Sequence, residues 1–343
     1  MLSKPLYTTN KGKAYCGDAN DLMRELQDES VDLVITSPPF ALQRQKAYGN
    51  EDQATYVSWL LSFTSEIKRI LKPTGSFVLD LGGAYQSGVP IRSIYQYRVL
   101  VRMCDELGWY LAEEFFWYNS SKLPSPIEWV NKRKLRAKDS VNTLWWFSKS
   151  TSPKANISNV LVPYSDRMAK LLSNKTKYYE PALRPSGHDI SEGFNKDNGG
   201  AIPSNLLQIP NTESNSQYLR FCKLVGATGH PARFPSKLPE FFIKFLTDEG
   251  DVVLDIFAGS NTTGAVAEAL NRRWLAFDLD QGYLAASALR FVRESEAKAV
   301  YDKLSSPEAS EVDISGQMLE LPLETPNLFN GLEFKTLEQL KEF

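Results

Sequence analysis

An apolar run that stops at two consecutive prolines is the feature that most constrains how this chain can fold. The run, residues 31–36 (VDLVIT), is rich in β-branched residues, a pattern typical of a buried strand. Pro38 and Pro39 then remove two backbone donors and fix two φ angles, so the strand cannot continue. We therefore expect a stiff loop at the carboxyl end of a strand, where open α/β sheets bind ligands. This loop is suited to binding a planar base: the Ser37 hydroxyl and the Pro38 carbonyl would bind its exocyclic amino group, and the Phe40 ring would stack on it. The alternative is that the prolines only stiffen the exit from the strand.

Strand-like and helix-like segments alternate along most of the chain. This rhythm predicts the α/β class, with a mostly parallel, twisted sheet. The expected strands are 13–16, 31–36, 76–81, 109–118, 143–147, 251–256 and 273–277, and the expected helices are 19–27, 56–71, 94–107, 238–246, 262–270 and 282–297.

Composition divides the chain into four expected segments. Residues 1–150 and 226–303 carry the alternating pattern and are expected to form two halves of one domain. Residues 151–225 are rich in Asn, Ser, Lys, Pro and Gly, which predicts an irregular, exposed insert. Residues 304–343 are acidic and polar and are expected to form a solvated tail.

Overall composition excludes several classes of function. No apolar run approaches the roughly 18 residues of a membrane span. Three cysteines and two histidines show no metal-ligand spacing, so we expect no metal site, and we expect a cytoplasmic protein. The formal net charge is −2, so any binding to nucleic acid must come from a local basic face.

A second motif, residues 255–264 (DIFAGSNTTG), follows an apolar strand and opens a helix. Gly259 allows a tight turn, after which the helix N-terminus presents unpaired N–H groups. Asp278 follows at the end of the next strand, 19 residues after Gly259 (278 − 259), close to the spacing at which an acid meets ribose hydroxyls. An adenosine-bearing ligand fits this unit, whereas the absence of GxGxxG disfavours nicotinamide and flavin cofactors. A simple helix-capping turn is the alternative.

With the proline loop before the adenosine-type loop, the chain resembles the β group of DNA amino-methyltransferases. The resemblance covers about residues 5 to 300 and is carried by TSPPFALQR, GSFVLDLGGAY, LPSPIEWVNKRK, PYSDRM, RPSGHDI, KDNGG, HPARFPSKLPEFFI and GSNTTG. It implies a permuted Rossmann-like fold, S-adenosylmethionine as cofactor without a metal, and duplex DNA as substrate. It also implies a cognate restriction endonuclease, action as a monomer, residues 151–225 as the target-recognition insert, and CAGCTG as a candidate target site.

The same resemblance implies site residues. The catalytic group would be Ser37, Pro38, Pro39 and Phe40, with Asp80 nearby. Without the resemblance, the favoured interpretation of Asp80 is an acid at a strand end that caps the Gly82-Gly83 turn. The cofactor-binding group would be Asp18, His230, Pro231, Phe234, Pro235, Asp255, Phe257, Gly259, Ser260, Asn261, Thr262 and Asp278. Asp278 stands where a similar member of the family has Glu.

The chemistry expected of the loop is direct methyl transfer to an exocyclic amino group. Ser37 and the Pro38 carbonyl would accept its two N–H groups and turn the nitrogen lone pair toward the methyl donor. The base would first be flipped out of the duplex, and Phe40 would stack on it. A serine at position 37, rather than Asp or Asn, favours cytosine N4 over adenine N6 in this family, and no Pro-Cys pair supports transfer to cytosine C5. Adenine-N6 methylation, an RNA methyltransferase and an idle binding module remain as alternatives.

Two groups of basic and polar residues are candidates for DNA contact. Lys132, Arg133, Lys134 and Arg136 follow Trp129 in what we expect to be one helix-like stretch, which is either a solvated face or a site of phosphate neutralisation. Within the insert, Arg184, His188 and Lys196 are candidates for DNA contact, and the sequence does not indicate which insert residues read base edges.

Overall fold

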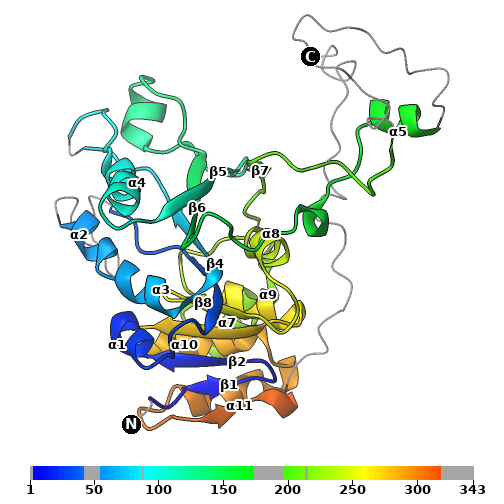
Figure 1. The fold of residues 1–343 in the computed structure, drawn as a ribbon. Coiled ribbons are helices and arrows are strands. Elements are labelled where there is room, and N and C mark those ends of the chain that lie inside the picture. The colour runs from blue at the N-terminus through cyan, green and yellow to red at the C-terminus, as the bar shows by residue number, and fades with distance from the viewer. Residues whose placement is uncertain (1–2, 42–54, 87, 174–195, 213–214, 318–343) are drawn as a thin grey trace, which may run out of the picture. The chain divides into compact units, whose positions relative to one another are not determined.

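One mixed sheet organises the protein (Figure 1). The structure, a computed structural model, describes residues 3–41, 55–86, 88–173, 196–212 and 215–317. Within these ranges the strand order is β10-β1-β2-β9-β8-β3-β4-β6-β5-β7. The strands are β1 (Tyr7–Thr8), β2 (Gly12–Cys16), β3 (Val31–Thr36), β4 (Leu71–Leu81), β5 (Tyr110–Tyr118), β6 (Val141–Ser148), β7 (Leu206–Gln208), β8 (Val252–Asp255), β9 (Arg273–Asp278) and β10 (Val312–Asp313).

The centre of the sheet is parallel, which confirms the expected fold class. Strands β2, β9, β8, β3 and β4 pair in parallel, while β6 is antiparallel to β4 and β5, and β1 is antiparallel to β2. The chain leaves β3 toward β4 on one side and leaves β8 toward β9 on the other. The neighbouring strands β3 and β8 therefore mark the point where strand order reverses, and ligands bind outside the carboxyl ends of strands at such a point.

Helices cover both faces of this sheet (Figure 1). Apolar residues of α1 to α4 share one core cluster with Val34, Phe77 and Leu79 of the central strands. On the other face, Phe242 of α8 packs 5.2 Å from Phe115 of β5, and α9 contacts β8 and β9. None of the described helices is both long and apolar enough to cross a membrane. The helices are α1 (Ala19–Arg24), α2 (Tyr56–Leu61), α3 (Thr64–Ile70), α4 (Tyr95–Asp105), α5 (Asp166–Ser173), α7 (Gln217–Val225), α8 (Lys237–Leu246), α9 (Thr262–Ala269), α10 (Gln281–Ser287) and α11 (Glu294–Leu304).

The continuous helix expected over 56–71 is wrong, because the chain breaks it into α2 and α3. The Ser62 hydroxyl donates to the Trp59 carbonyl at 2.6 Å, and the Thr64 hydroxyl donates to the Leu61 carbonyl at 2.7 Å. Both hydroxyls thus donate to backbone carbonyls at the junction of the two helices. Such side-chain bonds compete with the backbone hydrogen bonds of a continuous helix.

The helix expected over 282–297 is also interrupted. The chain forms α10, a short 3-10 turn over Ala288–Arg290 and then α11. Phe291, in the break, is fully buried and stacks on Trp274 of β9 with ring centroids 5.2 Å apart and planes 14° apart. The free energy gained by burying this aromatic side chain exceeds the free energy lost by interrupting the helix.

Contacts divide the chain into two compact units. Of the described residues, those within 3–155 and 205–317 form one unit, and residues 156–173 and 196–204 belong to the other. In the second unit, Tyr164 accepts a hydrogen bond from the Asn198 backbone and donates to Asp197. Within the expected irregular stretch 151–225, α7 is an ordered helix of the first unit with Tyr218 and Phe221 buried. The target-recognition role expected for residues 151–225 stays a prediction.

The tail is not wholly solvated, contrary to expectation. Val312 and Asp313 form β10 and pair in parallel with Tyr7 and Thr8. Ile314 is fully buried. The polar composition of this segment masks two apolar residues at alternate positions, which suffice for a short edge strand.

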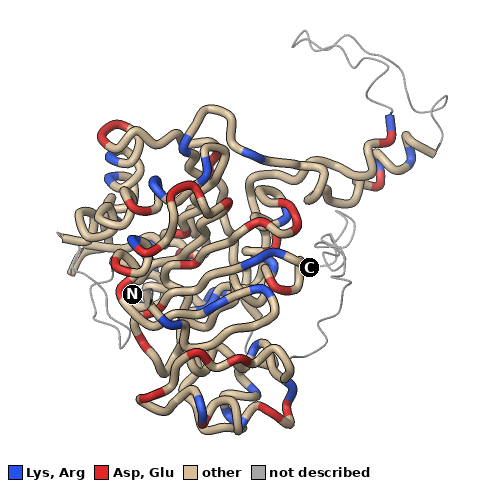
Figure 2. Tube along the Cα trace, turned by 60° about the horizontal axis from the view of Figure 1, so that its bottom comes forward, with Lys and Arg blue, Asp and Glu red and all other residues tan. Residues whose placement is uncertain are grey.

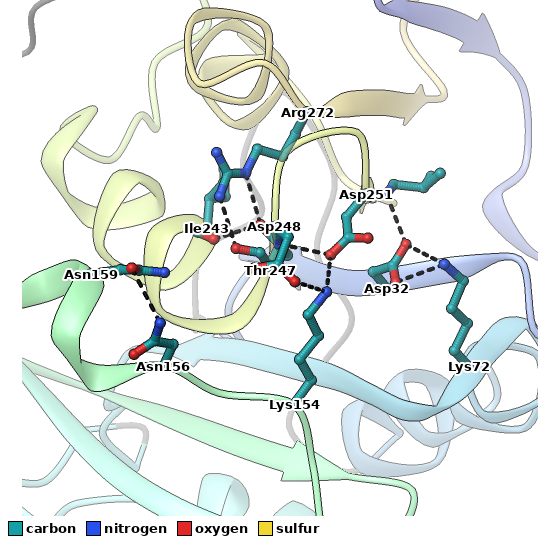
Figure 3. A network of polar contacts seen from close by, with 11 residues as sticks. Asp32, Lys72, Lys154, Asn156, Asn159, Ile243, Thr247, Asp248, Asp251 and Arg272 are labelled. Atoms are coloured by element: carbon teal, nitrogen blue, oxygen red, sulfur yellow. Dashed lines mark hydrogen bonds and ion pairs between the residues drawn. The ribbon is translucent and has the colours of Figure 1, made fainter.

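A polar network joins the amino-terminal ends of β3, β4 and β8, at the edge opposite the proline loop (Figure 3). Lys72 Nζ lies 2.8 Å from both oxygens of Asp32, and Asp32 also accepts the Val252 amide at 2.9 Å. Lys154 Nζ lies 2.6 Å from Asp251. These contacts hold β8 in register with β3 and β4 at the amino-terminal ends of the strands.

Candidate functional site

The two sequence motifs lie side by side at the carboxyl ends of β3 and β8. The Thr36 hydroxyl, at the end of β3, donates to Asp255 Oδ1 at 2.6 Å, and the Thr263 hydroxyl of α9 donates to Asp255 Oδ2 at 2.7 Å. The Phe257 amide also donates to Asp255, at 3.1 Å. Asp255 therefore ties the strand that leads into Ser37 to both ends of the second loop.

Asp255 is buried, with 2 % of its surface exposed. Burial raises the pKa of its carboxyl from 3.8 to about 6, although the bonds from Thr36 and Thr263 oppose this effect. Both carboxylate oxygens already hold donors from the protein. The structure gives Asp255 a positioning role, and its expected contact with a cofactor stays a prediction. Thr36 was not singled out from the sequence, because it lies 219 positions from Asp255. Thr263 was not singled out either, although it lies only eight positions from Asp255.

Ser37 and Asp80 are brought together as the resemblance implied. The Ser37 hydroxyl donates to Asp80 Oδ2 at 3.0 Å, and the Asn142 amide donates to Asp80 Oδ1 at 3.2 Å. The sheet explains this placement, since β3 and β6 flank β4, the strand that carries Asp80. Asn142 was missed from the sequence because it lies on an antiparallel neighbour far along the chain.

The Asp80 carboxyl is buried in this arrangement. Its exposed fraction is 4 %, and burial raises its pKa from 3.8 to about 6 against the lowering effect of the bonds from Ser37 and Asn142. At neutral pH the group is mainly ionised, and as a carboxylate it can only accept hydrogen bonds. The Ser37 proton therefore lies toward Asp80, and the lone pairs of Ser37 Oγ are available to accept from a ligand.

Phe40 and the end of the proline loop rest on the turn after β4. A Cβ atom at Gly82 would collide with the Phe40 ring, so only glycine permits this approach. The hydroxyl of Tyr95, from α4, donates to the Gly82 carbonyl and also bonds to the Ala41 backbone. Tyr95 is fully buried and was not expected to take part in the site. Its hydroxyl therefore connects the residues after β4 to the end of the proline loop through hydrogen bonds.

The second loop turns at Gly259 beneath a histidine. Gly259 has φ +50°, and a Cβ there would lie 3.1 Å from the His230 ring. Its amide donates to Asp278 Oδ2 at 2.7 Å, so the acid at the end of β9 contacts the loop directly. Burial raises the pKa of Asp278 and lowers the pKa of His230. His230 also packs edge-on against Tyr283, with ring centroids 4.7 Å apart.

Three expected cofactor residues, Ser260, Asn261 and Thr262, are buried where α9 begins. Asn261 caps that helix through the Gly264 amide at 3.0 Å, and the Ser260 hydroxyl lies 3.2 Å from that of Thr262. Arg290 Nε donates to the Ser260 carbonyl at 2.6 Å. These contacts shape the loop from within, and Arg290 was missed because it lies beyond the motif in sequence.

The remaining expected cofactor residues surround the same strand ends. Asp18 is exposed and caps α1 by accepting from the amides of Asn20 and Asp21. Phe257 packs on α3, with its ring centroid 5.2 Å from that of Phe63. Pro231, Phe234 and Pro235 lie in the segment that leads from His230 into α8.

This edge of the sheet suits S-adenosylmethionine. Gly259 turns the chain just before the N-terminus of α9, and the N-terminus of a helix favours a carboxylate. Asp278 and Asp18 supply acids at the ends of β9 and β2, which are paired at Cys16 and Asp278. Among the described residues, no group of three or more His, Cys, Asp or Glu side chains is placed to hold a metal ion.

The expected helical basic stretch is wrong beyond Lys132. A short π-helical turn covers Glu128–Lys132, and Lys134 has φ +52°, a left-handed conformation that ends the helix. Glu128 lies 3.3 Å from Lys132 and 2.9 Å from Arg133, so it partly neutralises both. Acidic and basic residues are interspersed along the described trace (Figure 2).

The candidate DNA-contact residues of the insert are mostly untested. Arg184 and His188 lie outside the described residues, and Lys196 lies in the second unit. DNA contact by these three residues stays a prediction.

Comparison with known proteins gives concordant results. A family model described as DNA methylase (N6_N4_Mtase) matches residues 31–289. The type II methyltransferase M.PvuII of Proteus hauseri is 58% identical over 314 residues, which cover 90% of this chain and 94% of that protein. M.BamHI of Bacillus amyloliquefaciens is 28% identical over 283 residues, 80% of this chain and 56% of that protein.

A solved structure agrees with the sequence matches. The PvuII DNA methyltransferase, described as cytosine-N4-specific, superposes with a TM-score of 0.74 at 50% identity, over 91% of this chain and 98% of that one. The family model matches three quarters of this chain, and M.PvuII is similar along nearly its whole length. Together these matches identify the family. The chain belongs to the N6/N4 DNA methylase family.

Proposed function

We propose that this protein transfers a methyl group from S-adenosylmethionine to the exocyclic N4 of cytosine in duplex DNA. The observation that carries the proposal is the hydrogen bond from Ser37 to buried Asp80, set beside the glycine loop at the sheet's switch point. The similarity to a methyltransferase described as cytosine-N4-specific supports cytosine as the target. We further propose CAGCTG as the target site and a restriction endonuclease of the same specificity as functional partner.

In this mechanism, Ser37 acts as an acceptor for the target amino group. Its proton is committed to Asp80 at 3.0 Å, so Ser37 Oγ accepts one N–H of the base while the Pro38 carbonyl accepts the other. These two bonds favour a pyramidal nitrogen whose lone pair is free to attack. As the nitrogen gains positive charge it loses a proton, which passes through Ser37 Oγ to Asp80, a carboxylate whose pKa of about 6 suits it to this task.

The cofactor would be held at the ends of β2, β8 and β9. S-Adenosylmethionine, when bound, supplies an electrophilic methyl group on its sulfonium. Asp278 would accept the ribose hydroxyls, and Asp18 would face the adenine. The Gly259 turn and the N-terminus of α9 would receive the methionine carboxylate. Asp255 keeps this loop in register with Ser37 through Thr36.

Because cytosine N4 is paired inside a duplex, the target base must be extruded. The extruded base would stack on the Phe40 ring, three residues after Ser37. The Phe40 ring itself packs against Gly82. We propose that the insert, residues 151–225, reads the target sequence. A palindrome has two equivalent halves, so a monomer can modify each in turn.

Protection of DNA in cells tests this proposal. Plasmid from cells that express the protein is expected to resist an endonuclease that cuts CAGCTG, because N4 methylation alters the major-groove edge of cytosine. Ser37→Ala is expected to leave the plasmid sensitive. Ser30→Ala is the matched control, since its hydroxyl bonds only locally to the Gln27 carbonyl before β3. Sensitivity of plasmid from wild-type-expressing cells would refute the proposed target site.

A further inference from the structure

A cavity beside the catalytic loop has no role in the proposed chemistry. It is an open hollow of about 410 Å³, and its lining includes Tyr85, Pro90, Arg92, Arg136, Lys138 and Asp139. Three cationic side chains and one carboxylate line it, which gives a formal charge of +2 (3 − 1). In a chain whose net charge is −2, this is a local concentration of positive charge.

The cavity adjoins the place where the target base would stack. Gly82 lies under the Phe40 ring, and the next residue, Gly83, lies under the Arg92 guanidinium, where a Cβ would collide with it. Consecutive Cα atoms are about 3.8 Å apart, so the aromatic surface and the guanidinium contact adjacent backbone units. The aromatic surface and the cavity are therefore linked through two consecutive residues, Gly82 and Gly83.

Two arginines in the cavity are held over one aromatic ring. The guanidinium of Arg136 lies 4.5 Å from the centroid of the Tyr85 ring, and that of Arg92 lies 5.9 Å from it. Arg92 NH1 pairs with Asp139 at 3.1 Å, and Arg136 donates to the Pro90 carbonyl. Stacking and these bonds restrict the side chains in advance, which lowers the entropy cost of binding an anion.

The chemistry of the cavity favours a phosphodiester over a base. Guanidinium groups match phosphate oxygens in a forked geometry, and each guanidinium has five N–H donors, more than the bonds to Asp139 or Pro90 require. The neighbouring pair Lys132 and Arg133 is a weaker candidate, because Glu128 shares its charge with both. The strongest phosphate site is thus the cavity beside Gly83, where Arg136 of the basic stretch is joined by Arg92.

We propose that Arg92 and Arg136 bind a backbone phosphate next to the extruded nucleotide and so hold the flipped strand in place. The proposal rests on the proposed function, because it takes DNA as the substrate. Arg92 was not expected from the sequence, since it stands alone between Pro90 and α4 and carries no motif. In this account it is a positioning residue, because it acts on the strand and not on the reacting nitrogen.

A double-mutant cycle between protein and DNA tests the contact. The full-length protein is titrated with a CAGCTG duplex in which each phosphate flanking the target cytosine is replaced in turn by an uncharged methylphosphonate. At one position, neutralisation is expected to weaken wild-type binding about tenfold but to weaken binding of Arg92→Gln less than about twofold. Arg92→Gln is also expected to make the slope of log K against log salt shallower by about 1.

The matched control is Arg102→Gln, which removes an exposed arginine from the same segment of chain, paired with Glu106 at the far end of α4. It should respond to every methylphosphonate as the wild type does. Equal penalties for wild type and Arg92→Gln at every position would overturn the proposal, as would an unchanged salt slope. Failure of the wild type to methylate DNA would instead refute the proposed function, so the two failures are distinguishable.

Discussion

Replacing Asp80 with asparagine removes a buried charge while keeping the shape of the side chain. In the folded protein burial raises the pKa of Asp80 to about 6, from 3.8 when the group is solvated. This difference corresponds to about 3 kcal/mol. Because the pKa of Asp80 is higher in the folded protein, the protonated carboxyl favours the folded state. This stabilising contribution is complete only below pH 3.8 and is lost as the pH rises through about 6.

The stability of Asp80→Asn should therefore depend on pH in a defined way. Asparagine does not titrate, so the difference in unfolding free energy, variant minus wild type, should increase with pH. From about pH 5 to about pH 8 the expected increase is about 1.4 kcal/mol, about half of the full effect. The similar titration of Asp255 is present in both proteins and cancels in the difference. Urea denaturation at several pH values measures this quantity.

The same substitution should remove activity. Without the carboxylate, Ser37 loses its fixed orientation and the amino proton loses its acceptor, so methyl transfer should slow about 100- to 1000-fold in single-turnover assays. The wild-type rate should rise with pH through about 6, because ionised Asp80 is the active form. The variant should lose this dependence on Asp80.

Asp32→Asn is the matched control. Asp32 is also buried, but Lys72 lies 2.8 Å from its carboxylate at the opposite end of β3, so the substitution breaks an ion pair and should lower stability without a comparable loss of rate. The reasoning would be refuted if the stability difference for Asp80→Asn failed to grow with pH. A methyl-transfer rate for Asp80→Asn within fivefold of wild type would refute it equally.

Two further substitutions test how the loops are held. Gly259→Ala places a side chain at φ +50° and 3.1 Å from His230, so S-adenosylmethionine should bind more than about tenfold more weakly while DNA affinity is kept; calorimetry that finds cofactor affinity within twofold would contradict this. Tyr95→Phe removes the hydroxyl that bonds to Gly82, so the unfolding free energy should fall by about 1–2 kcal/mol and the methyl-transfer rate about tenfold, with unchanged cofactor affinity. An unchanged rate for Tyr95→Phe would show that Gly82 needs no such anchor.

Local sequence signals predicted the parts of the site that lie within single segments. The apolar run before Pro38 identified β3 to the residue, because a β-branched segment with prolines after it has few other solutions. The glycine loop at Gly259 and the acid Asp278 were found from their spacing, which a βαβ unit imposes. The parallel order of the central strands followed from the same alternation.

What the sequence did not reveal depends on contacts between distant segments. Thr36, Asn142 and Tyr95 gain their roles only when β3, β4, β6 and α4 are assembled, and nothing near them in sequence signals it. The basic stretch failed as a helix because the backbone at Lys134 is left-handed, a local conformation that residue composition does not encode. The role of Arg92 could not be predicted, because the sequence does not show that Gly83 lies against its guanidinium.

The identity of the methylated nucleoside tests the central claim most directly. Duplex DNA containing CAGCTG is incubated with the protein and S-adenosylmethionine labelled in its methyl group, then digested to nucleosides and separated. The account predicts that the label appears in N4-methylcytosine and that Ser37→Ala abolishes it. Label in N6-methyladenine, label only when RNA is the substrate, or no label with wild-type protein would contradict the account.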